Sequence, residues 1–435
     1  DAQEGDSGPV LELGARPECE GLEPRFCMLP WPTDRWLVRD ESKITGHRLE
    51  YPIESTPENV NGIPLDPALI NGFDGFSPSS QLITIFPGPA AIDDLWGPDQ
   101  VESSITEDFP TVVMDLQSGE LIPHWIENDA RADSPEETLF FIRPATRLRP
   151  NRRYGVAIRG LLDGSGELFE PTLAFRALRD GLATDSIELE ARREGFESLF
   201  ETLETHGVAR ANLQQAWWFH TESFESSHQT MRSMRDDAIE RLGADGLGCE
   251  ILTREDGFRD RSTKLTGTFS VPWYMTSPTQ PSTISRDENG DPSFVEIRQV
   301  PFTAIIPDSL MNSDEPGALL VWGHGLFGQA EGTVSSRKVI DATDEFGAIA
   351  VATDWAGMSS NDLNFLALAL TDVSLFPHLG EMLQQGMINQ IALTRNMMGS
   401  CGDDPVFSHN ERKLFNPEVR YFIGGSQGSI LGATF

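Results

Sequence analysis

Short apolar stretches separated by turn-forming residues fill the first part of the chain. Residues 139–142, 154–158 and 173–175 are three such stretches, and the Asp-Gly-Ser-Gly run at 163–166 is one of the turns between them. Short strands at this spacing are typical of two packed antiparallel sheets. We therefore expect a β-rich, β-sandwich-like N-terminal domain over residues 15–180.

The spacing of apolar residues changes to a helical period between residues 185 and 243. Two helices are predicted, with apolar faces formed by Leu189, Phe196, Leu199, Phe200 and Leu203 and by Met231, Met234, Ala238 and Leu242. Each run is followed by a glycine, as helix ends often are. The residues at 213–221 lie between the two and are predicted to form a strand. We assign 181–249 as a segment of helices and a strand that connects two domains.

From about residue 250 onward, predicted strands and helices alternate. Apolar strands are expected at 267–275, 294–306, 319–322, 348–353 and 419–423, and helices at 333–346 and 379–398. A β–α–β–α–β order is typical of a parallel sheet with right-handed crossovers. We therefore predict a doubly wound, mostly parallel sheet in a second domain over residues 250–435.

The most informative motif lies near the end of this second domain. Gly424-Gly425-Ser426-Gln427-Gly428 fits the G-x-S-x-G pattern of a nucleophile elbow, in which a serine stands on a sharp turn between a strand and a helix. A strand is predicted before it, and a small apolar run follows it. Glycine is required beside the serine because a Cβ there would collide with the neighbouring strand and helix. Ser426 is therefore the candidate nucleophile, and Gly424 and Gly428 are expected to shape the turn.

A second motif follows the strand predicted at 319–322. It consists of Gly323-His324-Gly325-Leu326, and lipases and esterases place a loop of this kind where a backbone N–H helps to hold an oxyanion. We expect the amides of Leu326 and Gln427 to bind the oxygen that becomes negative in a tetrahedral intermediate. The first three residues of the motif are expected to shape this loop, and its histidine is not expected to act as a base.

With these motifs, the chain resembles a bacterial extracellular lipase or esterase whose α/β-hydrolase domain follows a β-rich lipase N-terminal domain. The group includes the lysophospholipase-like lipases of marine bacteria. The resemblance rests on both motifs, on Asp354-Trp355, and on residues 29–34, 71–76, 143–146 and 154–160. It implies an α/β-hydrolase fold and an exported, often lipoprotein-anchored carboxylic-ester hydrolase that acts on lipid or small-molecule esters. It also implies a secreted or outer-membrane-associated location, with peripheral or lipid-anchored attachment through a removed N-terminus.

One departure from this family's pattern concerns the catalytic acid and base. In such hydrolases both residues follow the nucleophile along the chain, but only nine residues follow Ser426 and none of them is Asp, Glu or His. A serine without a base is a poor nucleophile. We therefore expect a fragment that lacks its C-terminal strands, the acid and the histidine, with little or no turnover as it stands.

Two other functions remain open on the sequence alone. A serine peptidase of the prolyl-oligopeptidase type also joins a β domain to a G-x-S-x-G domain, although the repeated blades of its propeller are not found in this sequence. The second alternative is a non-catalytic surface module with a vestigial hydrolase fold. The intact serine and both glycine motifs argue against that alternative.

The net charge of the chain excludes polyanions as binding partners. Among its 435 residues, 33 are Lys or Arg and 68 are Asp or Glu, which gives a net charge of −35. A surface of this sign repels nucleic acid and anionic membranes, so nucleic acid is excluded as a partner. The acidity suits a secreted protein or a salty environment, and genome composition explains it equally well. No run of eighteen apolar residues is present, so no membrane-spanning helix is predicted.

The four cysteines indicate a disulfide and no metal site. Cys19 and Cys27 enclose a short polar loop and are expected to pair in an oxidising compartment, whereas Cys249 and Cys401 either pair or stay as buried thiols. The sequence has no C-x-x-C motif and no histidine pair at helical spacing, so neither structural zinc nor a cofactor is expected. The acidic residues 1–14 are predicted to form a disordered linker, left by a removed signal peptide or by a fragment boundary.

Overall fold

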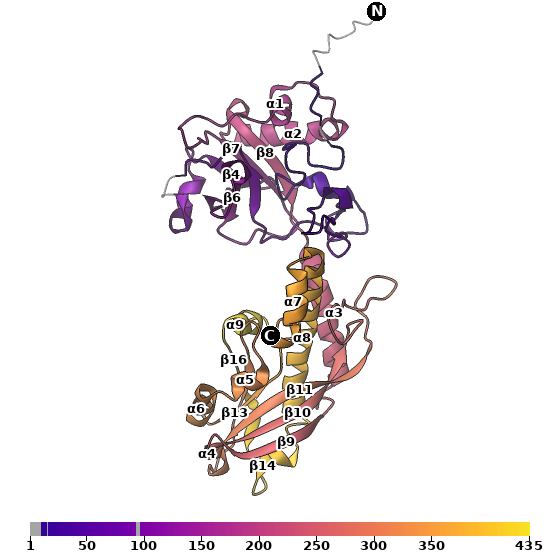
Figure 1. Ribbon diagram of the computed structural model, residues 1–435, viewed down its shortest axis with the longest axis vertical. Helices are drawn as coiled ribbons and strands as arrows, with labels where there is room; N and C mark the ends of the chain where they lie inside the picture. The colour runs from indigo at the N-terminus through magenta and orange to yellow at the C-terminus, as the bar shows by residue number, and fades with distance from the viewer. Residues whose placement is uncertain (1–9, 15, 93–95) are drawn as a thin grey trace, which may run out of the picture. The chain divides into compact units, whose positions relative to one another are not determined.

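The structure is a computed structural model that describes residues 10–14, 16–92 and 96–435 (Figure 1). Contacts within the chain divide it into two compact units, Asp1–Ser227 and His228–Phe435. Each unit has a hydrophobic core of its own and is described by itself. The linker predicted over 1–14 lies mostly outside the described residues.

Small antiparallel sheets dominate the described part of the N-terminal unit. One sheet has the strand order β3-β6-β5, a second has the order β4-β7-β8, and β1 pairs with β2. The strands are β1 (Leu37–Arg39), β2 (His47–Leu49), β3 (Leu82–Ile85), β4 (Thr111–Asp115), β5 (His124–Asn128), β6 (Leu139–Pro144), β7 (Arg153–Arg159) and β8 (Leu213–His220). The helices include α1 (Leu173–Asp180) and α2 (Ile187–Thr205).

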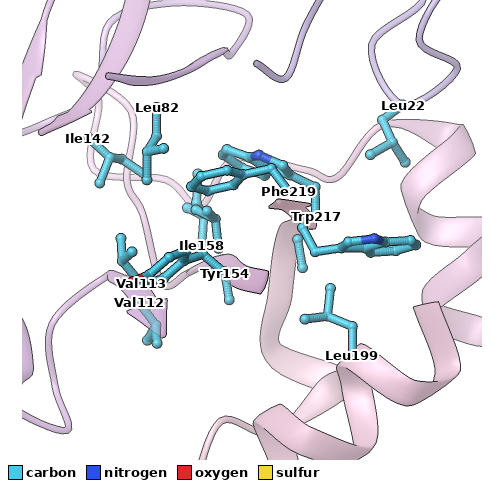
Figure 2. Close-up of a cluster of buried hydrophobic side chains, with 14 of the residues drawn as sticks. Leu22, Leu82, Val112, Val113, Ile142, Tyr154, Ile158, Leu199, Trp217 and Phe219 are labelled. Atoms are coloured by element: carbon cyan, nitrogen blue, oxygen red, sulfur yellow. The ribbon is translucent and has the colours of Figure 1, made fainter. Parts of the chain in front are cut away.

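Buried aromatic residues of β7 and β8 form the centre of this unit. Tyr154 and Phe219 face each other across the two strands, and their rings stack with centroids 5.8 Å apart. Figure 2 shows Leu82 of β3 in the same cluster. Trp218 points to the opposite face of β8, because side chains alternate along a strand, and packs edge-on against Phe196 of α2. Apolar side chains therefore cover both faces of the β4-β7-β8 sheet.

The apolar stretch at 173–175 is the start of α1, so the strand prediction was wrong. The hydroxyl of Thr172 accepts a hydrogen bond from the amide of Phe175 and caps the helix, and Gly181 ends it with a φ of 74°. Three apolar residues are too few to distinguish a helical period from a strand. Together with α2, this helix replaces the predicted β-sandwich by small sheets that helices cover.

The C-terminal unit is built on one mixed sheet with the order β16-β12-β13-β11-β10-β9. Its strands are β9 (Cys249–Phe258), β10 (Ser262–Trp273), β11 (Glu296–Pro307), β12 (Gly317–Gly323), β13 (Ala348–Ala352) and β16 (Phe415–Gly424). A separate short pair consists of β14 (Ser408–His409) and β15 (Arg412–Lys413). The helices are α3 (Phe224–Leu242), α4 (Asp308–Met311), α5 (Ala330–Val334), α6 (Arg337–Phe346), α7 (Leu363–Ala369), α8 (Phe376–Met398) and α9 (Gln427–Gly432).

The prediction of a doubly wound, mostly parallel α/β-hydrolase sheet is contradicted by this topology. Strand β12 pairs in parallel with β13 and β16, but the pairs β11–β13, β10–β11 and β9–β10 are antiparallel. The antiparallel pairing follows from the short connections between these strands. Strands β9 and β10 are joined by a tight turn at Arg259 and Asp260, which both have positive φ, and no helix lies between β10 and β11. Strands joined without a crossover pair antiparallel.

Helices cover both faces of the mixed sheet. Ile349 and Val351 of β13 belong to the core cluster beneath α8, whereas Ala350 and Ala352 pack with Val339 of α6. The alternation along one strand places these clusters on opposite faces. Figure 1 shows α8 as the longest helix of this unit, running along the sheet. Strands β12 and β13 are thereby largely buried, whereas β16, the edge strand that leads to Ser426, is largely exposed.

Two disulfides are present. Cys19 bonds to Cys27, which confirms the predicted local pair, and Cys249 bonds to Cys401, which joins the start of β9 to the turn after α8. Disulfides of this kind persist in oxidising compartments. Among the described residues, no helix is both long enough and apolar enough to cross a bilayer.

Candidate catalytic site

Ser426 occupies a tight turn between β16 and α9. Its backbone has φ 53° and ψ −124°, a combination that lies outside every region favoured by residues with a side chain. Holding a non-glycine residue there costs about 1–3 kcal/mol, and such strain is concentrated at functional sites. The side chain of Ser426 is exposed. The turn therefore presents its hydroxyl to solvent at the end of the strand.

Glycines on either side of Ser426 make this turn fit. A Cβ on Gly424 would overlap the backbone of Gly428, and a Cβ on Gly428 would overlap the carbonyl group of Gly323. Gly425 is different, because nothing lies within 4 Å of the position that its Cβ would take. Close packing of β12, β16 and α9 therefore requires glycine at 424 and 428 and leaves position 425 free.

The loop after β12 lies beside the elbow because the two strands are parallel neighbours. Trp322 pairs with Ile423 and Gly323 pairs with Gly424, so both strands end at the same edge of the sheet. The Cβ of Ser426 lies 3.5 Å from the point where a Cβ on Gly325 would be. A side chain at 325 would thus stand directly against the serine, and glycine leaves that space open.

The backbone amides of Leu326 and Gln427 have no hydrogen-bond partner within the described parts of the chain, and neither do the preceding amides of Gly325 and Ser426. The amides that follow are occupied, since Phe327 N–H donates to Met358 and Gly428 N–H donates to Gly425. The Gln427 amide is the first of a helix, where no intrahelical acceptor exists. The N–H groups of Leu326 and Gln427 are therefore available to a ligand oxygen.

His324 is fixed by backbone groups at both ring nitrogens. Its Nε2 accepts a hydrogen bond from Trp355 N–H at 2.8 Å, so the proton is on Nδ1, which donates to the carbonyl of Gly325 at 2.8 Å. The side chain is almost fully buried. In this arrangement the imidazole has no free nitrogen with which to take a proton from Ser426.

The loop after β13 supports the His324 loop and was identified from the sequence only through resemblance. Asp354 accepts hydrogen bonds from Ala330 N–H at 2.6 Å and from the side-chain amide of Asn361 at 3.0 Å. Its Oδ1 is 3.9 Å from His324 Nε2. The sequence signal for this cluster is that each of the two loops follows an apolar strand. Strands β12 and β13 are parallel neighbours, so the loops after them meet at one edge of the sheet.

The structure brings together Ser426, the Leu326 and Gln427 amides and the glycines, but it brings no base. Within residues 10–14, 16–92 and 96–435, no hydrogen bond joins a histidine or a carboxylate to the Ser426 hydroxyl. The side-chain amide of Gln427 is buried next to the serine, and neither of its polar atoms has a partner in that part of the chain. The same residues contain no cluster of His, Cys, Asp or Glu arranged to hold a metal ion.

Neither the models of known protein families nor the curated proteins include a match to this chain.

Proposed function

We propose that this chain carries the nucleophile and the oxyanion-binding groups of a serine esterase. The observation that carries the proposal is the strained backbone of Ser426, at an edge of the sheet where the Leu326 and Gln427 amides have no partner among the described residues. A folded protein retains such strain only where its surroundings enforce it. Here the close packing of Gly424 and Gly428 enforces it.

In the proposed reaction, Ser426 Oγ bonds to the carbonyl carbon of a carboxylic ester. The carbonyl oxygen becomes negative and accepts hydrogen bonds from the Leu326 and Gln427 amides, whose dipoles are already oriented. The C–O bond to the alcohol then breaks, and the alcohol leaves with the proton that the serine gave to a base. Water releases the acid from the acyl-serine by the reverse sequence.

Because no base contacts Ser426 in the described residues, we expect low turnover by residues 1–435. We further propose that the protein is exported, of the extracellular lipase or esterase type, and acts on lipid or small-molecule esters. The two disulfides support export. The acidic surface supports a neutral ester substrate over a polyanion.

External imidazole tests the proposal, because it can supply the missing base. We expect imidazole to raise hydrolysis of p-nitrophenyl acetate by the intact chain roughly tenfold or more above the rate with Ser426→Ala. The Ser426→Ala sample measures the reaction of imidazole with the ester itself. Equal rates for the two proteins at every imidazole concentration would rule out Ser426 as the nucleophile.

A further inference from the structure

A cavity of about 260 Å³ lies in the N-terminal unit. Its lining comes from four places in the sequence, namely Leu116 and Gln117 after β4, Arg153 on β7, Ser198 and Thr202 on α2, and His220 on β8. Arg153 and His220 are direct partners across the two antiparallel strands. Their side chains therefore leave the sheet on the same face, toward α2.

No carboxylate forms an ion pair with Arg153 among the described residues. Its Nε is buried and has no hydrogen-bond partner there. The guanidinium lies over the ring of Trp218, 4.8 Å from the centroid. Burial lowers the pKa of Arg153, and the nearby Asp34 carboxylate opposes that shift. The chain has 68 acidic and 33 basic residues. An unpaired, half-buried guanidinium carries a free-energy cost of burial that is not compensated by a carboxylate, and a bound anion would reduce it.

The other polar residues of the cavity are held in fixed orientations. Asp34 accepts hydrogen bonds from the backbone N–H of His220 at 2.7 Å and from its Nδ1 at 2.6 Å, which fixes the orientation of the ring. The side-chain oxygen of Gln117 accepts a hydrogen bond from Arg152, which leaves the NH₂ group as a donor. The cavity thus combines one cation with preoriented polar groups, the arrangement that fixes a small polar ligand.

We propose that this cavity binds a small monocarboxylate, with the Arg153 guanidinium as its charge partner and the Gln117 side-chain NH₂ group as a hydrogen-bond donor. A guanidinium matches the two oxygens of a carboxylate. Only one cation of the lining is unpaired, and the carboxylates of Asp34 and Asp115 lie next to lining residues. A doubly charged phosphate would be repelled by both. The site is independent of the chemistry proposed for Ser426.

Titration of the intact chain with butyrate, followed by calorimetry, tests this assignment. We expect saturable binding that weakens at least about tenfold in Arg153→Met, which keeps the side-chain volume but removes the charge. Arg149→Met is the matched control, because Arg149 is exposed, pairs with Glu120 and lies outside the cavity lining. This control is expected to bind butyrate as the unchanged protein does.

A second variant keeps the test valid if Arg153→Met fails to fold. Ser198 lies at an exposed position of α2 and lines the cavity. Ser198→Leu adds volume there without removing a core contact, so we expect it to abolish butyrate binding with an unchanged thermal midpoint. Absence of saturable binding to the intact chain, or equal binding by the unchanged protein and a folded variant, would overturn the proposal. Tighter binding of inorganic phosphate than of butyrate would overturn the choice of a monocarboxylate.

Discussion

Glu222 is a nearly buried carboxyl group whose environment disfavours its charge. Burial and the neighbouring Asp74 carboxylate raise its pKa to about 7, and Arg147 and a hydrogen bond with Ser226 only partly oppose them. The protonated form is therefore favoured in the folded protein up to about neutral pH. In an unfolded chain the same group ionises near its ordinary value of 4.5.

We predict that Glu222 makes the N-terminal unit less stable as the pH rises. Because the pKa is higher in the folded state, this contribution is fully present below pH 4.5 and is lost between pH 4.5 and about 7, by at most about 3 kcal/mol. Glu222→Gln should flatten urea-unfolding stability across this window, whereas Glu225→Gln at an exposed neighbouring position should not. An unchanged pH profile in Glu222→Gln would contradict the assignment.

At the scale of elements, the elbow depends on how closely β12, β16 and α9 approach one another. Gly428→Ala would place a Cβ on the Gly323 carbonyl group, so the backbone must shift. We expect a loss of about 1–3 kcal/mol in the free energy of unfolding. Gly425→Ala is the control in the same motif, and its open position predicts a change within about 0.5 kcal/mol. Chemical unfolding measures both, and equal losses would show that close packing at position 428 is not the cause.

Local patterns in the sequence predicted many elements but not how the strands pair. The apolar runs at 319–322, 348–353 and 419–423 are found as β12, β13 and β16, and the helix at 379–398 is found within α8. The parallel sheet was mispredicted because apolar periodicity reports burial and not strand direction. Direction depends on the connections, such as the turn at Arg259 and Asp260.

The elbow around Ser426 and the cavity around Arg153 differ in how well they could be predicted from the sequence. Gly424 and Gly428 could be explained from the sequence alone, because a short motif carries its own steric reason. The cavity around Arg153 could not, because its lining is collected from a loop after β4, from β7, from α2 and from β8. That Arg153 lacks an ion-pair partner can be recognised only when the residues around it in space are known.

At the scale of the whole molecule, each unit carries one disulfide. Cys19–Cys27 closes a sequence separation of 8 and Cys249–Cys401 one of 152. Loop-closure entropy predicts losses of about 2.5 and about 5 kcal/mol when they are replaced by serine pairs. We expect each replacement to lower protection from hydrogen exchange chiefly in its own unit. A uniform loss of protection across both units would contradict their independence.

Covalent labelling of the folded chain with a fluorophosphonate, followed by peptide mapping, tests directly whether Ser426 is an activated nucleophile. We expect modification at Ser426, faster when imidazole is added, no modification in Ser426→Ala, and unchanged labelling in Ser400→Ala, an exposed serine that follows α8. If Ser426 stays unmodified in the folded protein while the reagent labels other serines, it is not an activated nucleophile and the esterase proposal fails.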